Sequence, residues 1–68
     1  MSITLKAARV NIGFTQKEAA KALGIAVDTL GNYERGNRYP DVEMIQKIEK
    51  LYGLSYNEID FSREKITV

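Results

Sequence analysis

A sharp bend between two short helical patterns is the feature that most constrains this fold. In the stretch TQKEAAKALGIAVDTLGNYERG, residues 15–36, apolar residues recur at helical spacing on both sides of Gly24. The stretch contains no proline and no polar loop, so Gly24 is its one obvious breaker between the two patterns. Glycine readily adopts the left-handed backbone conformation that ends a helix. The pattern therefore predicts two helices that cross steeply over a very short turn.

The residues around the bend have the sizes that such a crossing needs. Ala20 is small, so two helix backbones can approach closely there, while Ile25 and Leu30 fill the angle between the helices. Leu23 anchors the first of the two helices from below. The second helix then projects a polar face outward. This geometry is typical of a helix-turn-helix, whose second helix has the right shape to enter a DNA major groove.

Capping and breaking residues predict the other helices. Leu5, Ala8 and Ile12 recur at helical spacing before Gly13, which predicts a first helix over roughly residues 3–12. Thr15 and Glu18 form a capping box that starts the second helix.

The second half of the chain repeats these signals. Residues 40–41, Pro-Asp, start a fourth helix with an apolar stripe that ends near Tyr52. Ser55 and Glu58 form a second capping box, which predicts a short fifth helix around Ile59. The tail FSREKITV alternates weakly and is compatible with a strand, an extended segment or disorder.

Composition excludes several classes of function. The chain of 68 residues is long enough for one small domain. It contains no cysteine and no histidine, which removes thiol chemistry, the commonest general base and the commonest metal ligand. It also lacks a glycine-rich phosphate loop and a long apolar run. We therefore expect no enzyme activity, no cofactor or metal, no small-molecule substrate and no membrane span. The polar start predicts a cytoplasmic protein without a signal peptide.

The charges are unevenly distributed along the chain. Residues 1–40 carry six basic and three acidic side chains, whereas residues 41–68 carry four basic and six acidic ones. A basic first half fits a polyanionic partner, although a difference of this size is also common by chance.

The combined pattern resembles the Cro/CI-type (XRE-like) helix-turn-helix family of phage and bacterial regulators. The resemblance covers roughly residues 5–60, and the residues that carry it are Gln16, Ala20, Gly24, Ile25, Leu30, YERG at 33–36, Pro40 and IQKIEKLYGLSYNEI at 45–59. It implies an all-α, five-helix lambda-repressor-like DNA-binding domain over residues 1–61, followed by a tail over residues 62–68. It also implies a small, repressor-like transcriptional regulator that binds a palindromic double-stranded DNA operator as a homodimer. The family's short members are often phage or prophage regulators.

The resemblance also implies which residues face DNA, with a recognition helix at about residues 27–35. The expected set is Gln16, Lys17, Val27, Asp28, Thr29, Asn32, Arg35, Asn37 and Arg38. Gln16 is expected to hold a phosphate, with an ordinary solvated helix start as the alternative. Asn32 can bond an adenine edge with two hydrogen bonds, and Thr29 can contact a base or a phosphate.

Four further members of this set leave alternatives open. Asp28 either accepts a hydrogen bond from cytosine or only favours the helix dipole. Val27 either touches a thymine methyl or belongs partly to the core. The loop with Asn37 and Arg38 either contacts phosphates or is solvated.

The family pattern also implies two structural contacts. Arg9 and Glu34 are expected to form a partly buried ion pair between the first and third helices. Tyr56 and Phe61 are the expected dimer contacts, because the C-terminal region holds more apolar surface than one short helix needs.

Two residues depart from the family pattern. Ala26 stands where a capping Ser or Thr is common, and Gly31 lies inside the recognition helix. The main alternative function is a protein-interaction module that reuses the fold, such as an antirepressor or an antitoxin-like partner.

Overall fold

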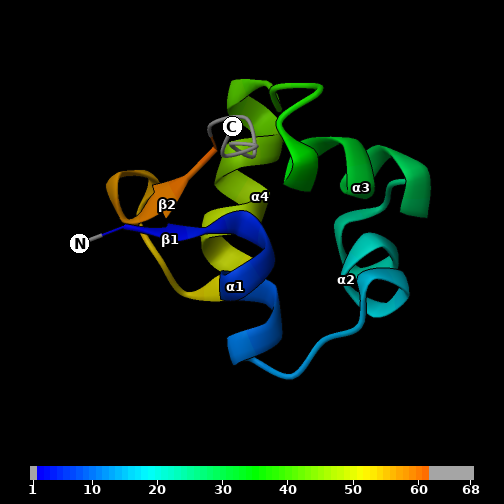
Figure 1. Ribbon diagram of the computed structural model, residues 1–68, viewed down its shortest axis with the longest axis horizontal. Helices are drawn as coiled ribbons and strands as arrows, with labels where there is room; N and C mark the ends of the chain where they lie inside the picture. The colour runs from blue at the N-terminus through cyan, green and yellow to red at the C-terminus, as the bar shows by residue number, and fades with distance from the viewer. Residues whose placement is uncertain (1, 62–68) are drawn as a thin grey trace, which may run out of the picture.

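The computed structural model describes residues 2–61, which form a small helical domain with one short parallel sheet. The elements in chain order are β1 (Ile3–Thr4), α1 (Leu5–Asn11), α2 (Gln16–Leu23), α3 (Val27–Arg35), α4 (Val42–Tyr52), the 3-10 turn η1 (Tyr56–Glu58) and β2 (Ile59–Asp60). Figure 1 shows α2 and α3 at one end of the molecule and the two strands at the other, with α1 and α4 between them. The polar face of α3 is thus carried at one end of the domain.

Side-chain caps start three of the helices. Thr4 Oγ1 accepts a hydrogen bond from the backbone N–H of Ala7 at 3.0 Å, and Asp41 Oδ1 accepts one from Met44 at 2.8 Å. The expected capping box at the start of α2 forms in both directions, because Thr15 Oγ1 accepts from the Glu18 N–H and Glu18 Oε1 accepts from the Thr15 N–H. The hydrogen bond from the Thr15 backbone lowers the pKa of Glu18. The Glu18 carboxylate therefore stays charged and bonded at neutral pH.

The core lies where the four helices and the sheet meet. Its largest fully buried side chains are Leu5 of α1, Leu30 of α3 and Ile48 of α4, and each is at most 1% exposed. The other buried apolar residues are Ala8, Ala19, Ala20, Leu23, Tyr33, Tyr52, Ile59 and Phe61. Burial raises the pKa of Tyr52 to about 12, and the negative charge of Glu34 adds to this shift. Tyr52 is therefore a protonated core residue at neutral pH rather than a base.

The expected fifth helix around Ile59 is wrong. The second capping box does form, with Glu58 Oε1 accepting from the Ser55 N–H at 2.9 Å, but the turn that follows contains only residues 56–58. Ile59 is extended, with φ −109° and ψ 131°, and pairs in parallel with Ile3. β-branched residues fit a pleated strand well, and pairing with β1 buries Ile59 in the core. For the same reason the first helix begins at Leu5 rather than near Ile3.

Helix α3 begins without a side-chain cap. Ala26 has the extended backbone of an N-cap residue, with φ −70° and ψ 150°, but it has no oxygen to bond the first free amides. We expect Ala26→Ser to raise the free energy of unfolding by about 1 kcal/mol, because the serine hydroxyl would accept one of these N–H groups. Chemical denaturation of both proteins measures the difference, and Ala22→Ser, at an exposed position within α2, is the control that should not stabilise.

The expected tail over residues 62–68 lies outside the described residues. The domain boundary expected at residue 61 therefore stays a prediction.

Candidate nucleic-acid interface

The corner between α2 and α3 is built as its sequence predicts. Gly24 ends α2 with φ +74°, in the left-handed region, and the next N–H, that of Ile25, bonds back to the Ala20 carbonyl at 3.0 Å. Ala20 is 1% exposed, so its small side chain lies fully inside the crossing of the two helices. The bend thus needs only three residues between α2 and α3, and it holds α3 rigidly against α2.

A buried ion pair joins α1 to α3. Arg9 Nε donates to Glu34 Oε2 at 2.7 Å, and Arg9 Nη2 donates to Glu34 Oε1 at 3.3 Å. The two side chains are only 9% and 4% exposed. Arg9 Nη1 also donates to the carbonyl of Phe14 at 2.9 Å, which ties the loop between α1 and α2 to the same guanidinium. The Arg9 guanidinium therefore ties α3 to α1 and to the loop between α1 and α2.

The Glu34 carboxylate also binds Gln16, which belongs to the expected DNA-facing set. Gln16 Nε2 donates to Glu34 Oε1 at 3.1 Å, so the amide at the start of α2 is oriented by the ion pair. One hydrogen of this amide nitrogen is used in the bond, and the other remains for an external acceptor. The half-buried Gln16 is thus a held donor rather than a freely rotating surface side chain.

The outer face of α3 carries the expected polar set. Asp28 and Arg35 are exposed, while Thr29 and Asn32 are half-buried. Val27 is 39% exposed and is not part of the core cluster. No partner for the Asp28 carboxylate is found among the described residues, so its place in the first turn of α3 is its one clear interaction.

Arg35 folds back along α3 instead of extending into solvent. Its Nη2 donates to Asn32 Oδ1 at 2.9 Å. A methyl group at Gly31 would lie 3.2 Å from Arg35 Nη1 and 3.6 Å from Gln16 Nε2. Two polar side chains, Arg35 and Gln16, therefore lie over the bare backbone of Gly31, which explains why this glycine is buried on a polar face.

The loop after α3 is ordered by its own backbone. Gly36 ends the helix with φ +76°, and the N–H groups of Asn37 and Arg38 bond to the Asn32 carbonyl at 2.9 and 3.4 Å. The side chains of Asn37 and Arg38 are exposed beside the end of α3, and Lys17 is exposed near the start of α2. The basic residues expected at the interface are therefore free of carboxylate partners among the described residues.

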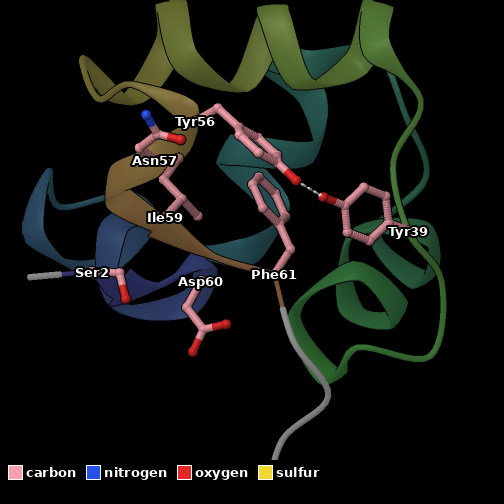
Figure 2. A pocket seen from close by; sticks show the side chains of 7 residues that line it. All are labelled: Ser2, Tyr39, Tyr56, Asn57, Ile59, Asp60 and Phe61. Atoms are coloured by element: carbon pink, nitrogen blue, oxygen red, sulfur yellow. Dashed lines mark hydrogen bonds between the residues drawn. The ribbon is translucent and has the colours of Figure 1, made fainter.

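An aromatic cluster lies at the surface between the loop before α4 and the second strand. Figure 2 shows Tyr39 reaching toward Tyr56, and their hydroxyl groups are hydrogen-bonded to each other. This bond raises the pKa of Tyr39. The ring of Phe61 lies 5.6 Å from each tyrosine ring between centroids. The cluster borders an open hollow of about 430 Å³.

The two expected dimer contacts differ in exposure. Tyr56 is 42% exposed and available to a partner, whereas Phe61 is 7% exposed and packs into the core of its own chain. Tyr39 is not one of the expected dimer contacts, but at 58% it has the highest exposed fraction of the three aromatic residues in the cluster. Its contact with Tyr56 spans 17 residues of sequence, so no local pattern could reveal it.

Within residues 2–61, no three or more His, Cys, Asp or Glu side chains are grouped so that they could hold a metal ion. None of the helices in this range is long and apolar enough to cross a membrane.

Comparison with known proteins agrees with this geometry. A family model described as helix-turn-helix matches residues 5–59. The chain is 49% identical over 51 residues to the HTH-type transcriptional regulator ImmR of Bacillus subtilis (strain 168), and 44% identical over 55 residues to the uncharacterized HTH-type transcriptional regulator YazB of the same organism. It is 33% identical over 51 residues to the cryptic phage CTXphi transcriptional repressor RstR of Vibrio cholerae. No solved structure matches the chain significantly.

These matches cover different shares of the relatives. The alignments take in 75%, 81% and 75% of this chain, but 40%, 80% and 46% of ImmR, YazB and RstR, respectively. The chain therefore spans less than half the length of two of these three relatives.

Proposed function

Because this chain belongs to the helix-turn-helix family, we propose that it is a transcriptional regulator that binds a specific double-stranded DNA operator through α3. The main observation in support is the polar outer face of α3. The Arg9–Glu34 ion pair fixes this helix to α1 on its buried side. A recognition helix must be held in position and must present polar groups that can still bond to DNA. The ion pair and the exposed side chains of α3 support both requirements.

Each part of the surface has a separate role in the proposed complex. Gln16, Lys17, Asn37 and Arg38 bind phosphates on either side of the groove, and so set the depth and direction of α3. Asp28, Thr29, Asn32 and Arg35 reach base edges, and Val27 is the apolar residue available to a thymine methyl. Binding of this kind releases counterions, so its affinity falls steeply with salt.

The proposed assembly is a homodimer on a palindromic operator. Tyr39, in the loop after α3, and Tyr56, in η1, supply exposed aromatic surface. A two-fold contact there would place two copies of α3 on one duplex. Occupancy of the operator would block or recruit RNA polymerase in the bacterial cytosol or nucleoid. A phage or prophage origin is supported by relatives such as RstR and the SPbeta prophage-derived regulator YonR, which is 35% identical over 51 residues.

Selection of bound duplexes from a randomised pool tests this function. The wild type should recover a palindrome with half-sites about 10 base pairs apart, or a multiple of that spacing. Asn32→Ala should change the preference at a defined position in each half-site, since it removes a base-reading amide. The matched control is Gln46→Ala, which removes an exposed amide from α4 and should leave the motif unchanged.

The salt dependence of binding supplies the second measurement. Arg38→Ala should weaken all duplexes alike and reduce the slope of log affinity against log salt by about 0.9, as for one lost phosphate contact. Failure to recover any motif at moderate salt, together with salt-insensitive binding to a protein partner, would favour the interaction-module function instead.

A further inference from the structure

Arg35 and Asn32 are hydrogen-bonded to each other on the outer face of α3. The two side chains are one helical turn apart, and Arg35 Nη2 donates to Asn32 Oδ1 at 2.9 Å. From this geometry, and resting on the function proposed above, we propose that Arg35 and Asn32 act as one donor pair that selects guanine in the major groove.

The argument follows from counting donors and acceptors. Asn32 alone would read adenine by donating from Nδ2 to N7 and accepting from the N6 amino group at Oδ1. Here one of the two lone pairs of Oδ1 already accepts from Arg35, so Asn32 retains two Nδ2 hydrogens and a single acceptor site. Arg35 retains four of its five N–H donors. A surface whose donors far outnumber its acceptors matches a base edge with two acceptors, and guanine presents that edge through O6 and N7.

Gly31 makes this arrangement possible. A Cβ there would lie 3.2 Å from Arg35 Nη1 and 3.7 Å from Nη2, so the guanidinium occupies the space that a side chain would fill. The first distance is tighter than ordinary contact, and an alanine would push the guanidinium outward by a few tenths of an ångström. Gly31 thus has a specificity role that offsets its unfavourable helix propensity.

Gln16 borders the same space above Gly31. Its Nε2 lies 3.6 Å from the same Cβ position and is fixed by its bond to Glu34. The guanidinium and a side chain that is tied to the buried ion pair therefore both lie over Gly31. A donor fork held in place loses less entropy on binding than a free one.

The same selection experiment, run with Arg35→Ala and Gly31→Ala, tests the pair. We expect the wild type to recover guanine at one position of each half-site. Arg35→Ala should lose at least about tenfold in discrimination for guanine there. Adenine should then be preferred at that position, because Asn32 Oδ1 is free again. Gly31→Ala should lose discrimination several-fold while its melting temperature holds or rises, since alanine favours the helix.

The alternative role for Arg35 is a phosphate contact, and it gives a different result. Arg35→Ala would then weaken all sequences alike, reduce the salt slope by about 0.9 and leave the selected bases unchanged. That result overturns the inference, as does a wild-type motif without guanine at the affected position, and both leave the proposed DNA-binding function intact. A wild type that selects no motif at all overturns both. Arg35 is exposed, so its loss should not unfold the domain.

Discussion

Glu34→Ala is expected to lower the free energy of unfolding by about 3–5 kcal/mol. The Glu34 side chain is 4% exposed and accepts hydrogen bonds from both Arg9 and Gln16. Removing it leaves the Arg9 guanidinium, itself 9% exposed, without a counter-charge in a desolvated place. For a domain of this size each kcal/mol shifts the melting temperature by about 4–8 °C, so the loss should be large.

Thermal and urea unfolding of Glu34→Ala and Arg38→Ala provides the comparison. Arg38 is exposed and unpaired among the described residues, so its removal should change the free energy of unfolding by less than about 0.5 kcal/mol. In an Arg9→Met background the cost of Glu34→Ala should shrink, because no buried charge is left behind. Equal melting temperatures for the two single variants would show that the ion pair has no such structural role.

The sequence was most informative where local signals and packing agree. The capping box at Thr15, the break at Gly24 and the small Ala20 together predicted the α2–α3 corner that the structure contains. The capping box at Ser55 also predicted a helix, but there a strand pairing distant in sequence determines the backbone instead. Ile59 pairs with Ile3 across most of the chain, and a pattern of a few residues contains no information about that pairing.

The candidate interface shows the same limit at the level of side chains. The DNA-facing set implied by the family resemblance contained both Asn32 and Arg35, but it treated Asn32 as an independent reader of adenine. The bond between them depends on the rotamer of Arg35, and that rotamer depends on the space above Gly31. Family resemblance flagged Gly31 only as a departure from the usual pattern. Its role becomes visible when the position of the guanidinium is known.

Leu30→Ala is expected to destabilise the domain by about 2–5 kcal/mol. Leu30 lies on the inner face of α3, is 0% exposed and is one of the three largest fully buried side chains. Its truncation removes apolar contacts and leaves a cavity in the core behind the corner with α2. The whole stability of a small domain is about 5–15 kcal/mol, so a measurable fraction of this variant should be unfolded at physiological temperature. Val42→Ala, which shortens a side chain that is 70% exposed, is the control and should cost far less.

Duplex DNA distinguishes this core defect from a defect of the interface. Leu30→Ala leaves every outward-facing group of α3 in place, so an operator duplex at about a hundred times its dissociation constant should stabilise the variant by about 2.7 kcal/mol. The wild type should gain the same amount, and differential scanning fluorimetry with and without duplex measures both. Asn32→Ala should show the opposite behaviour, with an unchanged melting temperature in isolation and a smaller gain from DNA. If the duplex stabilised wild type but not Leu30→Ala, the cavity would have moved α3 itself, and its inner and outer faces could not be treated as separate determinants of stability and recognition.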